Sequence, residues 1–262
     1  MTASILYCGD TNLEGAACYL AGILTYYGLT FDYIPSHVQL SRQEIENRQL
    51  FIFSDYPASQ VSVPIQQAIV RSVALGAGFL MIGGWESFHG FGGNWDGTPI
   101  AEMLPVEIQT KDDRLNFCHG AILAPPRGVS GLWDLPWEAP PVIGGANRLE
   151  LKEGRDWNLL LQAFPMTPHR FQPHGQKEFE FEWKPSPCSY PILVTSDDRR
   201  GRVASFASDV APHWVGGFVD WGDKRVSTQA AGANAIEVGS YYSLFWKQLL
   251  AWTGRLKVKN PC

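Results

Sequence analysis

Short apolar runs alternate with segments of helical spacing over the first third of the chain. Continuous apolar runs bounded by turn-forming residues predict buried strands at residues 4–8, 29–34, 50–54 and 78–83. Apolar side chains recur at the spacing of a helix face over residues 13–27 and 64–76. Because parallel neighbours need a crossover helix, this alternation predicts an α/β fold with a doubly wound, mostly parallel sheet.

Individual polar residues and glycines predict where the helices begin and end. Asn12 is the expected N-cap of the first long helix, and Gly28 is expected to end it. Ser41 is followed three residues later by Glu44, which is the spacing of a capping box. We therefore expect a short polar helix between the second and third strands.

The pattern changes after Gly84, where helical spacing gives way to loops and short strand-like pieces. Residues 85–105 are rich in glycine and aromatic side chains. Residues 106–190 carry short apolar runs separated by connections rich in proline and tryptophan. This stretch is therefore expected to be a β-rich insertion in the α/β core.

The α/β pattern returns near the end of the chain. Two apolar runs, at residues 191–195 and 202–208, predict a hairpin. Ser240 is expected to cap a closing helix that Gly254 ends. We expect residues 1–254 to form one domain and residues 255–262 to form a C-terminal tail.

Composition narrows the class of protein and its partners. The 262 residues are 45% hydrophobic and 18% charged, with a formal net charge of −5, which is typical of a globular chain. An acidic balance is unsuited to tracking phosphates, so no nucleic-acid partner is expected. No apolar run approaches the ~18 residues of a membrane helix, so no membrane partner is expected.

The cysteines and the N-terminus predict a cytoplasmic location. The first residues contain no basic segment typical of a signal peptide. Five cysteines are scattered without a C-x-x-C pair, which favours a reducing compartment over a disulfide framework or zinc ribbon.

Candidate site residues follow the predicted strands. In open parallel sheets, ligands bind beyond the carboxyl ends of the strands. Polar or aromatic residues stand at those ends, namely Asp10, Asn12, Asp55, Trp85, Glu86, Ser87, His89, Asp209, His213 and Trp214. Each carboxylate taken singly is better explained by a cap or a turn, and each tryptophan is equally well explained by pinning a loop. Taken together, they predict a ligand pocket.

Within this set, Glu86, Asp209 and His213 are the expected catalytic acid–base groups, and the others are expected to contact the ligand. We assign no metal ligands and no cofactor. A metal held by His89 and His213 with Glu86 or Asp209 stays an alternative.

The turn after the fourth strand is where a nucleophile elbow would stand. It reads Gly83-Gly84-Trp85-Glu86-Ser87, with neither a cysteine nor a G-x-S-x-G motif. The residue types therefore exclude cysteine catalysis at this turn. Ser87 is a candidate nucleophile, and its alternative role is that of an N-cap or a turn hydroxyl.

Several segments together resemble one protein family. They are Gly76-Ala-Gly-Phe-Leu-Met-Ile-Gly-Gly84 with Ser87-Phe88, residues 97–101 and 104–106, Gly145-Ala-Asn-Arg148, residues 201–209 with Ala211-Pro-His-Trp214, and the aromatic spacing over residues 242–252. The sequence resembles the putative glutamine amidotransferase-like domain family of the class I glutamine amidotransferase-like superfamily. It is also similar to trehalose-utilisation-type proteins.

The resemblance implies a flavodoxin-like parallel sheet. Amidotransferases of this superfamily use an elbow cysteine with a histidine and a glutamate late in the chain. The matching turn here carries Gly83 and Gly84, so the resemblance does not imply glutamine hydrolysis by that mechanism. His213 stands roughly where superfamily members place their late histidine.

Two functional hypotheses remain at this point. The first is an enzyme that acts on a small polar metabolite, with carbohydrates among the candidates. The second is a non-catalytic ligand-binding or assembly protein on the same fold. The expected partner is a small molecule in both cases, and homo-oligomerisation is left open.

Overall fold

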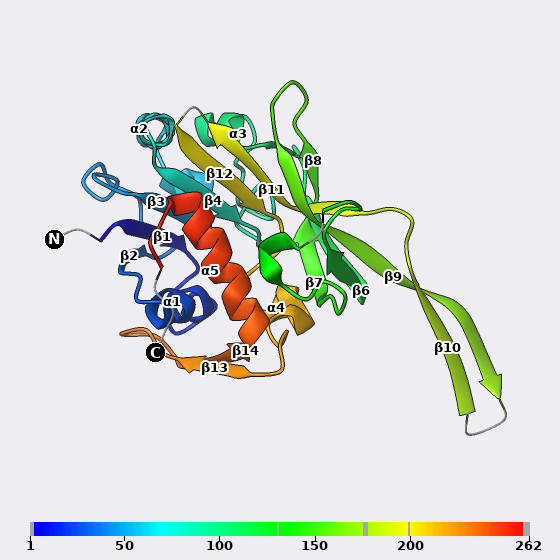
Figure 1. Ribbon diagram of the computed structural model, residues 1–262. Coiled ribbons are helices and arrows are strands. Elements are labelled where there is room, and N and C mark those ends of the chain that lie inside the picture. The colour runs from blue at the N-terminus through cyan, green and yellow to red at the C-terminus, as the bar shows by residue number, and fades with distance from the viewer. Residues whose placement is uncertain (1–2, 130, 175–177, 199, 259–262) are drawn as a thin grey trace.

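A ten-stranded mixed sheet forms the centre of the molecule (Figure 1). The computed structural model describes residues 3–129, 131–174, 178–198 and 200–258. The strands follow the order β2-β1-β3-β4-β12-β11-β9-β6-β7, and β10 pairs with β9 outside this path. The expected α/β character is therefore confirmed.

One half of the sheet is parallel. It consists of β2 (Phe31–Ile34), β1 (Ile5–Gly9), β3 (Leu50–Ser54), β4 (Gly78–Ile82) and β12 (Gly201–Phe206). Strands β1, β3 and β4 are buried along their whole length, which explains why they are continuous apolar runs in the sequence. The carboxyl ends of these parallel strands meet at one edge of the sheet.

The other half of the sheet is antiparallel. It consists of β11 (Tyr190–Asp198), β9 (Asn158–His174), β6 (Arg114–Ala124) and β7 (Val142–Asn147). The predicted hairpin is present as β11 and β12. Strand β9 continues past the sheet and pairs with β10 (Glu178–Pro185), and this hairpin projects from the body of the molecule (Figure 1).

Helices cover both faces of the parallel strands. Figure 1 shows α1 (Ala17–Tyr26) and α5 (Ser240–Gly254) on one face and α2 (Val63–Ala74) and α3 (Pro99–Met103) on the other. The remaining elements are α4 (Pro212–Val215), the 3₁₀ turns at Ala58–Gln60, Leu132–Asp134 and Gly216–Phe218, and the two-stranded ladders β5 (Val106–Ile108) with β8 (Leu149–Leu151) and β13 (Arg225–Thr228) with β14 (Ile236–Gly239). Within the described residues, no helix is long and apolar enough to cross a membrane.

Three boundary predictions are wrong. Helix α1 begins at Ala17 because Asn12 accepts the amides of Glu14 and Gly15 at 3.0 and 2.8 Å, and so holds a turn before the helix. Ser41 begins a series of turns rather than a helix. Its amide donates to the Glu44 carboxylate at 2.6 Å, so the capping contact forms without a helix following it.

The third correction concerns α5, where Gly239 rather than Ser240 occupies the N-cap position.

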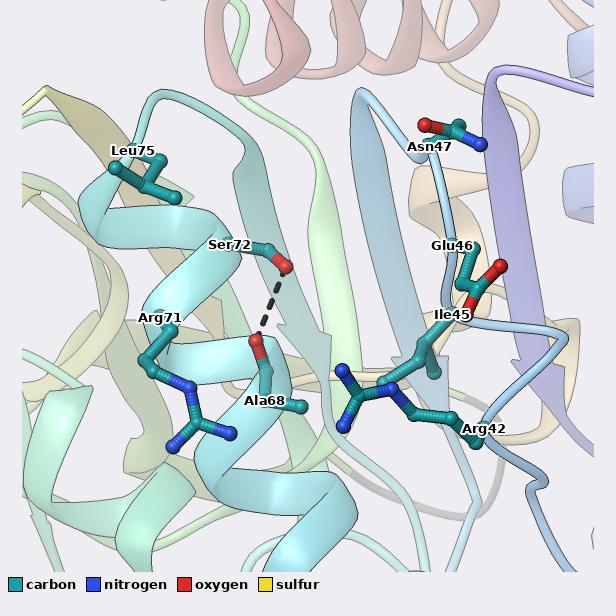
Figure 2. A pocket seen from close by; sticks show the side chains of 8 residues that line it. All are labelled: Arg42, Ile45, Glu46, Asn47, Ala68, Arg71, Ser72 and Leu75. Carbon is teal, nitrogen blue, oxygen red and sulfur yellow. Dashed lines mark hydrogen bonds between the residues drawn. The ribbon is translucent and has the colours of Figure 1, made fainter.

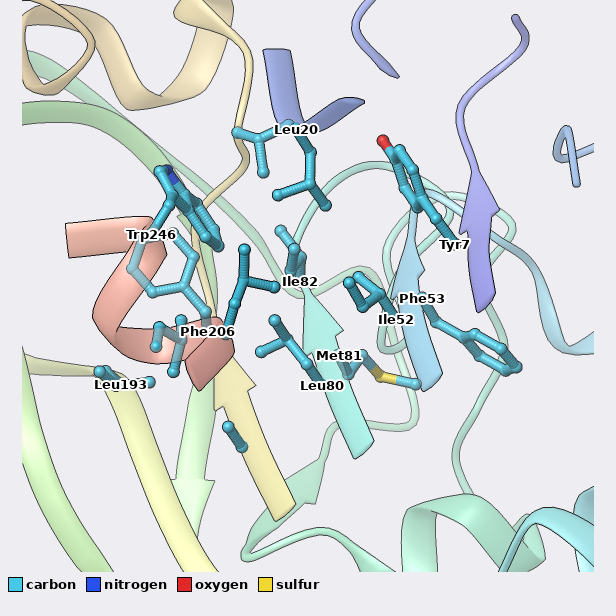
Figure 3. Packing of buried hydrophobic residues seen from close by; sticks show 14 of the residues in the cluster. Tyr7, Leu20, Ile52, Phe53, Leu80, Met81, Ile82, Leu193, Phe206 and Trp246 are labelled. Atoms are coloured by element: carbon cyan, nitrogen blue, oxygen red, sulfur yellow. The ribbon is translucent and has the colours of Figure 1, made fainter. Parts of the chain in front are cut away.

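Helix α5 packs aromatic side chains on the sheet. Its Trp246 ring lies 5.1 Å from Phe206 of β12, and both side chains are fully buried (Figure 3). The contact ties the chain's last helix to the strand that leads into the candidate site.

Candidate functional site

Three aspartates converge where parallel strands end. Asp10 follows β1, Asp55 follows β3, and Asp209 lies three residues beyond β12. The Asp10 amide donates to the carbonyls of Ser54 and Asp55 at 3.0 and 3.2 Å, which joins the first two loops. His213 of α4 stands beside Asp209. We refer to Asp10, Asp55, Asp209 and His213 as the aspartate–histidine cluster.

Asp10 is buried directly after the carboxyl end of β1. The Tyr7 hydroxyl donates to its Oδ2 at 2.9 Å, and the side chain is only 6% exposed. Burial, and then the negative charges of Asp209 and Asp55, raise the pKa of the Asp10 carboxyl well above its ordinary value. Asp10 therefore keeps its proton to a higher pH than a free carboxyl does.

Asp55 is held against the loop that follows β4. The Glu86 amide donates to its Oδ1 at 2.7 Å, and its own amide donates to the Ser87 hydroxyl oxygen at 2.9 Å. Burial, and then the charge of Asp209, raise the pKa of the Asp55 carboxyl well above its ordinary value. Burial and the charge of Asp209 therefore raise the pKa of both the Asp10 and the Asp55 carboxyl groups.

The Asp55 carboxylate occupies the space beside the turn after β4. A Cβ atom on Gly84 would lie 2.1 Å from Asp55 Oδ1, and the Gly84 φ of +155° also disfavours a side chain. A Cβ atom on Gly83 would lie 2.1 Å from the Ala207 carbonyl oxygen. Both glycines are therefore needed for the close approach of this turn to its neighbours.

Asp209 and His213 form an ion pair across the first turn of α4. Asp209 is fully buried, and its Oδ1 accepts the amides of Val210 and Ala211. Its Oδ2 lies 2.8 Å from His213 Nε2, and the histidine side chain is 53% exposed. Contact with the Asp209 carboxylate raises the pKa of the His213 imidazole. The pair therefore presents an oriented imidazole to solvent.

The loop after β4 is anchored by two buried polar side chains. Asn147, at the end of β7, accepts the Gly84 amide at 3.0 Å and donates to Asp113 at 2.7 Å. Asp113 also accepts the amides of His89 and Gly90 at 3.1 and 2.9 Å. Burial raises the pKa of the Asp113 carboxyl. These contacts, which come from the antiparallel half of the sheet, hold the turn at Gly83 and Gly84 (the glycine turn) in place.

Trp85 carries an exposed aromatic ring beside this turn. Its side chain is 52% exposed, and the Arg114 guanidinium carbon lies 4.2 Å from the ring centroid. Phe91 is also exposed and packs edge-on to Trp85 at 6.3 Å. Asp112 holds Arg114 through two hydrogen bonds, at 2.9 and 2.7 Å. One face of Trp85 is thus already occupied by a cation.

The structure brings together some of the predicted site residues and separates others. Asp10, Asp55, Asp209 and His213 form the cluster, and Glu86 joins it through its amide. The remaining residues make other contacts. Ser87 and Trp214 are buried, Asn12 holds its turn, and His89 Nδ1 lies 2.6 Å from Asp96 Oδ1.

Sequence reasoning missed three residues that support the cluster. Tyr7 is a polar tip in an apolar strand three residues before Asp10, which is a recognisable signal. Asn147 stands in a segment that carried the family resemblance, although its bridging role was not expected. No sequence signal marks Asp113, because its contacts join distant segments.

The alternative metal set is not gathered in this fold. In the part of the chain that the structure describes, no group of three or more histidine, cysteine, aspartate or glutamate side chains is arranged to hold a metal ion. His89 is instead paired with Asp96.

Comparison with known proteins identifies the fold and the family. The family model described as putative glutamine amidotransferase matches residues 14–171. No curated protein sequence matches the chain.

Solved structures share this fold at low sequence identity. The cytoplasmic protein STM1381 from Salmonella typhimurium LT2 is 24% identical, with a TM-score of 0.69 over 95% of this chain and 98% of its own. The cytoplasmic protein STM3548 from Salmonella typhimurium is 21% identical, with a TM-score of 0.68 over the same shares. A ThuA-like protein from Parabacteroides merdae is 12% identical, with a TM-score of 0.58 over 99% of this chain and 92% of its own.

Proposed function

The chain belongs to the family described as putative glutamine amidotransferase, and from that premise we propose that its aspartate–histidine cluster acts on a small polar molecule. The burial of carboxyl groups beside a half-exposed imidazole carries this proposal. Strongly perturbed titratable groups gather at functional sites more often than elsewhere, because such groups are costly to retain.

The position of the cluster in the sheet supports a ligand site. The order β2-β1-β3-β4-β12 corresponds to that of a flavodoxin-like, doubly wound sheet, which we propose for the parallel half. In such sheets the ligand lies beyond the carboxyl ends where the strand order reverses. Here that reversal falls between β1 and β3, and Asp10 and Asp55 directly follow these strands.

We propose that the protein does not hydrolyse glutamine by the elbow-cysteine mechanism. The turn after β4 carries Gly83 and Gly84, and Asp55 fills the space where an elbow side chain would begin. Ser87 is only 1% exposed, and its hydroxyl oxygen accepts the Asp55 amide, so it supports Asp55 rather than attacking a substrate. Chemistry at this edge therefore falls to proton-transfer groups.

His213 and Asp10 are suited to opposite roles in proton transfer. Asp209 orients the His213 ring through Nε2 and leaves the half-exposed imidazole to act as the general base. Asp10 holds its proton to higher pH, as a general acid requires. Glu86, which lies against Asp55, is a further acid–base candidate. Arg114 covers one face of the half-exposed Trp85 ring, and the other face would be the flat surface that favours a carbohydrate or a similar polyhydroxylated ligand.

Ligand-induced stabilisation tests this site. Wild type is screened by thermal shift against D-glucose, D-galactose, trehalose and gluconate, because a ligand of the folded state raises Tm by mass action. We expect at least one of them to raise Tm in wild type and in His37→Gln, which alters an exposed histidine outside the cluster. His213→Gln should lose that rise. Equal rises in all three proteins, or none in any, would contradict the proposal.

The alternative is a ligand-binding or assembly protein that performs no chemistry. The exposure of His213 favours this alternative, because 53% of its side chain is open to solvent, whereas an enzyme usually shields the reacting groups from water. NMR analysis of the stabilising compound after incubation in D2O separates the two. Product formation or C–H exchange that His213→Gln abolishes supports the enzyme, whereas binding without either supports the alternative.

Cellular context completes the proposal. We propose a cytoplasmic protein that uses neither nucleic acid nor a membrane, on the basis of its net charge of −5 and the cytoplasmic naming of two structural relatives. One domain over residues 1–254, with residues 255–262 as a tail, remains our proposed organisation. Self-association is left to measurement of the mass in solution.

A further inference from the structure

A pocket lies at the edge of the sheet opposite the aspartate–histidine cluster. It is formed between the turns that precede β3 and the last turns of α2, and its volume is about 340 Å³ (Figure 2). The lining consists of Arg42, Ile45, Glu46, Asn47, Ala68, Arg71, Ser72 and Leu75. None of these residues takes part in the proposed function.

Two arginines face this pocket without an acidic partner. Figure 2 shows Arg42 reaching from the turns toward α2, from which Arg71 extends. Among the described residues, neither guanidinium has a hydrogen-bonded or ion-paired carboxylate. Nearby Arg48, by contrast, is paired with Asp32. The two free guanidinium groups are thus available to an anion from outside the chain.

The other lining groups restrict what that anion can be. Glu46 also lines the pocket, so the two arginines leave one formal positive charge in excess, which favours a monoanion. Ser72 already donates its hydroxyl to the Ala68 carbonyl at 3.0 Å. Ile45 and Ala68 supply a buried apolar floor, and Leu75 is 75% exposed at the rim. An apolar chain attached to the anionic group would cover this surface.

We propose that this pocket binds a small carboxylic acid with an apolar chain. The planar guanidinium groups of Arg42 and Arg71 would hold the carboxylate, since arginine matches that group with paired N–H donors. The chain would lie on Ile45, Ala68 and Leu75. The pocket stands apart from the carboxyl ends of the strands, so this proposal does not depend on the function of the cluster.

Hexanoate titration followed by amide NMR tests the pocket. The structure predicts saturable shifts of the Asn47 and Ser72 amides, and none with the neutral hexanamide. Each of Arg42→Gln and Arg71→Gln should raise the Kd about tenfold, as expected for loss of a charged hydrogen bond. The matched control is Arg127→Gln, which alters an exposed arginine elsewhere and should leave the Kd unchanged.

Two outcomes would overturn the proposal. The first is an absence of saturable shifts with hexanoate, and saturable binding of inorganic phosphate in that case would assign the pocket to inorganic anions. The second is unchanged affinity for hexanoate in the double variant Arg42→Gln/Arg71→Gln. Far-UV circular dichroism of each variant verifies that the fold is retained.

Discussion

The aspartate–histidine cluster gathers ionisable groups that ordinarily repel one another. Asp10 and Asp55 are kept near Asp209 by backbone contacts between strand ends and by the glycine turn, not by any favourable pairing among the carboxyls. His213 is the one basic side chain of the group, and it pairs with Asp209. The arrangement therefore stores an electrostatic cost that depends on pH.

Replacing Asp10 should make folding less sensitive to pH. Its raised pKa means that the folded state keeps a proton that the unfolded chain releases above about pH 4, so stability falls as the pH rises from there toward the folded pKa. An asparagine side chain cannot ionise, so Asp10→Asn should gain stability relative to wild type over that range, and the gain should grow as the pH rises. Urea unfolding at several pH values measures this gain.

The matched control for this series is Asp156→Asn, which alters an exposed aspartate. Its difference from wild type should stay flat with pH. A flat difference for Asp10→Asn as well would contradict the assigned electrostatic cost.

The His213 imidazole should titrate above an ordinary histidine because of Asp209. The raised pKa stabilises the folded state below the unfolded value of about 6.5, and this contribution is lost as the pH rises through the folded value. NMR titration of the ring protons should show the pKa of His213 falling in Asp209→Asn. A His213 pKa that is insensitive to Asp209→Asn would show that the ion pair is not formed.

At the residue scale, the sequence predicted the cluster better than its surroundings. Asp10, Asp55, Asp209 and His213 follow from one rule, that ligand groups stand at the carboxyl ends of parallel strands. The same rule misplaced Trp214, which is 4% exposed and packs on the backbone of Gly145. The sequence predicts which residues follow a strand. Whether the side chain of such a residue reaches solvent depends on neighbours from distant segments.

Among the elements, the link between β7 and the turn after β4 should carry measurable stability. Asn147 is fully buried and bridges the Gly84 backbone to Asp113. Asn147→Ala leaves those groups without partners and should lower the free energy of unfolding by about 1–3 kcal/mol. Denaturant unfolding beside Asn116→Ala, which alters an exposed asparagine of β6, measures the difference. Equal effects of the two substitutions would remove the anchoring role from Asn147.

Strands and long helices could be predicted because each is specified by its own residues. Strands β1, β3 and β4 are buried apolar runs, and α2 buries Ala68, Ile69 and Val73 along one face. The turn at Asn12 and the turns after Ser41 could not, since the same side-chain hydrogen bonds serve both turns and helix caps. The projecting β9–β10 hairpin could not be predicted either, because alternating apolar and polar residues predict a strand without specifying its partner.

At the scale of the whole molecule, one aromatic core joins the sheet to the closing helix. Phe206 of β12 contacts Phe218, Phe245 and Trp246, with ring centroids 5.1 to 6.5 Å apart. Phe206→Ala should therefore lower the free energy of unfolding by about 3–5 kcal/mol. Phe91→Ala, which alters an exposed ring, should change it by no more than about 0.5 kcal/mol.

Urea denaturation of both variants measures this contrast. Similar losses in the two would show that the aromatic core does not hold α5 on the sheet. Because β12 leads directly to Asp209, the same core also positions the cluster.

The most direct test of the central claim is imidazole NMR of His213 during titration with D-glucose, D-galactose, trehalose and gluconate. If the aspartate–histidine cluster is the ligand site, at least one of these compounds moves the His213 ring resonances saturably and leaves those of the exposed His37 in place. If no compound moves His213, or if both histidines move alike, the cluster is not the site of a polyhydroxylated ligand.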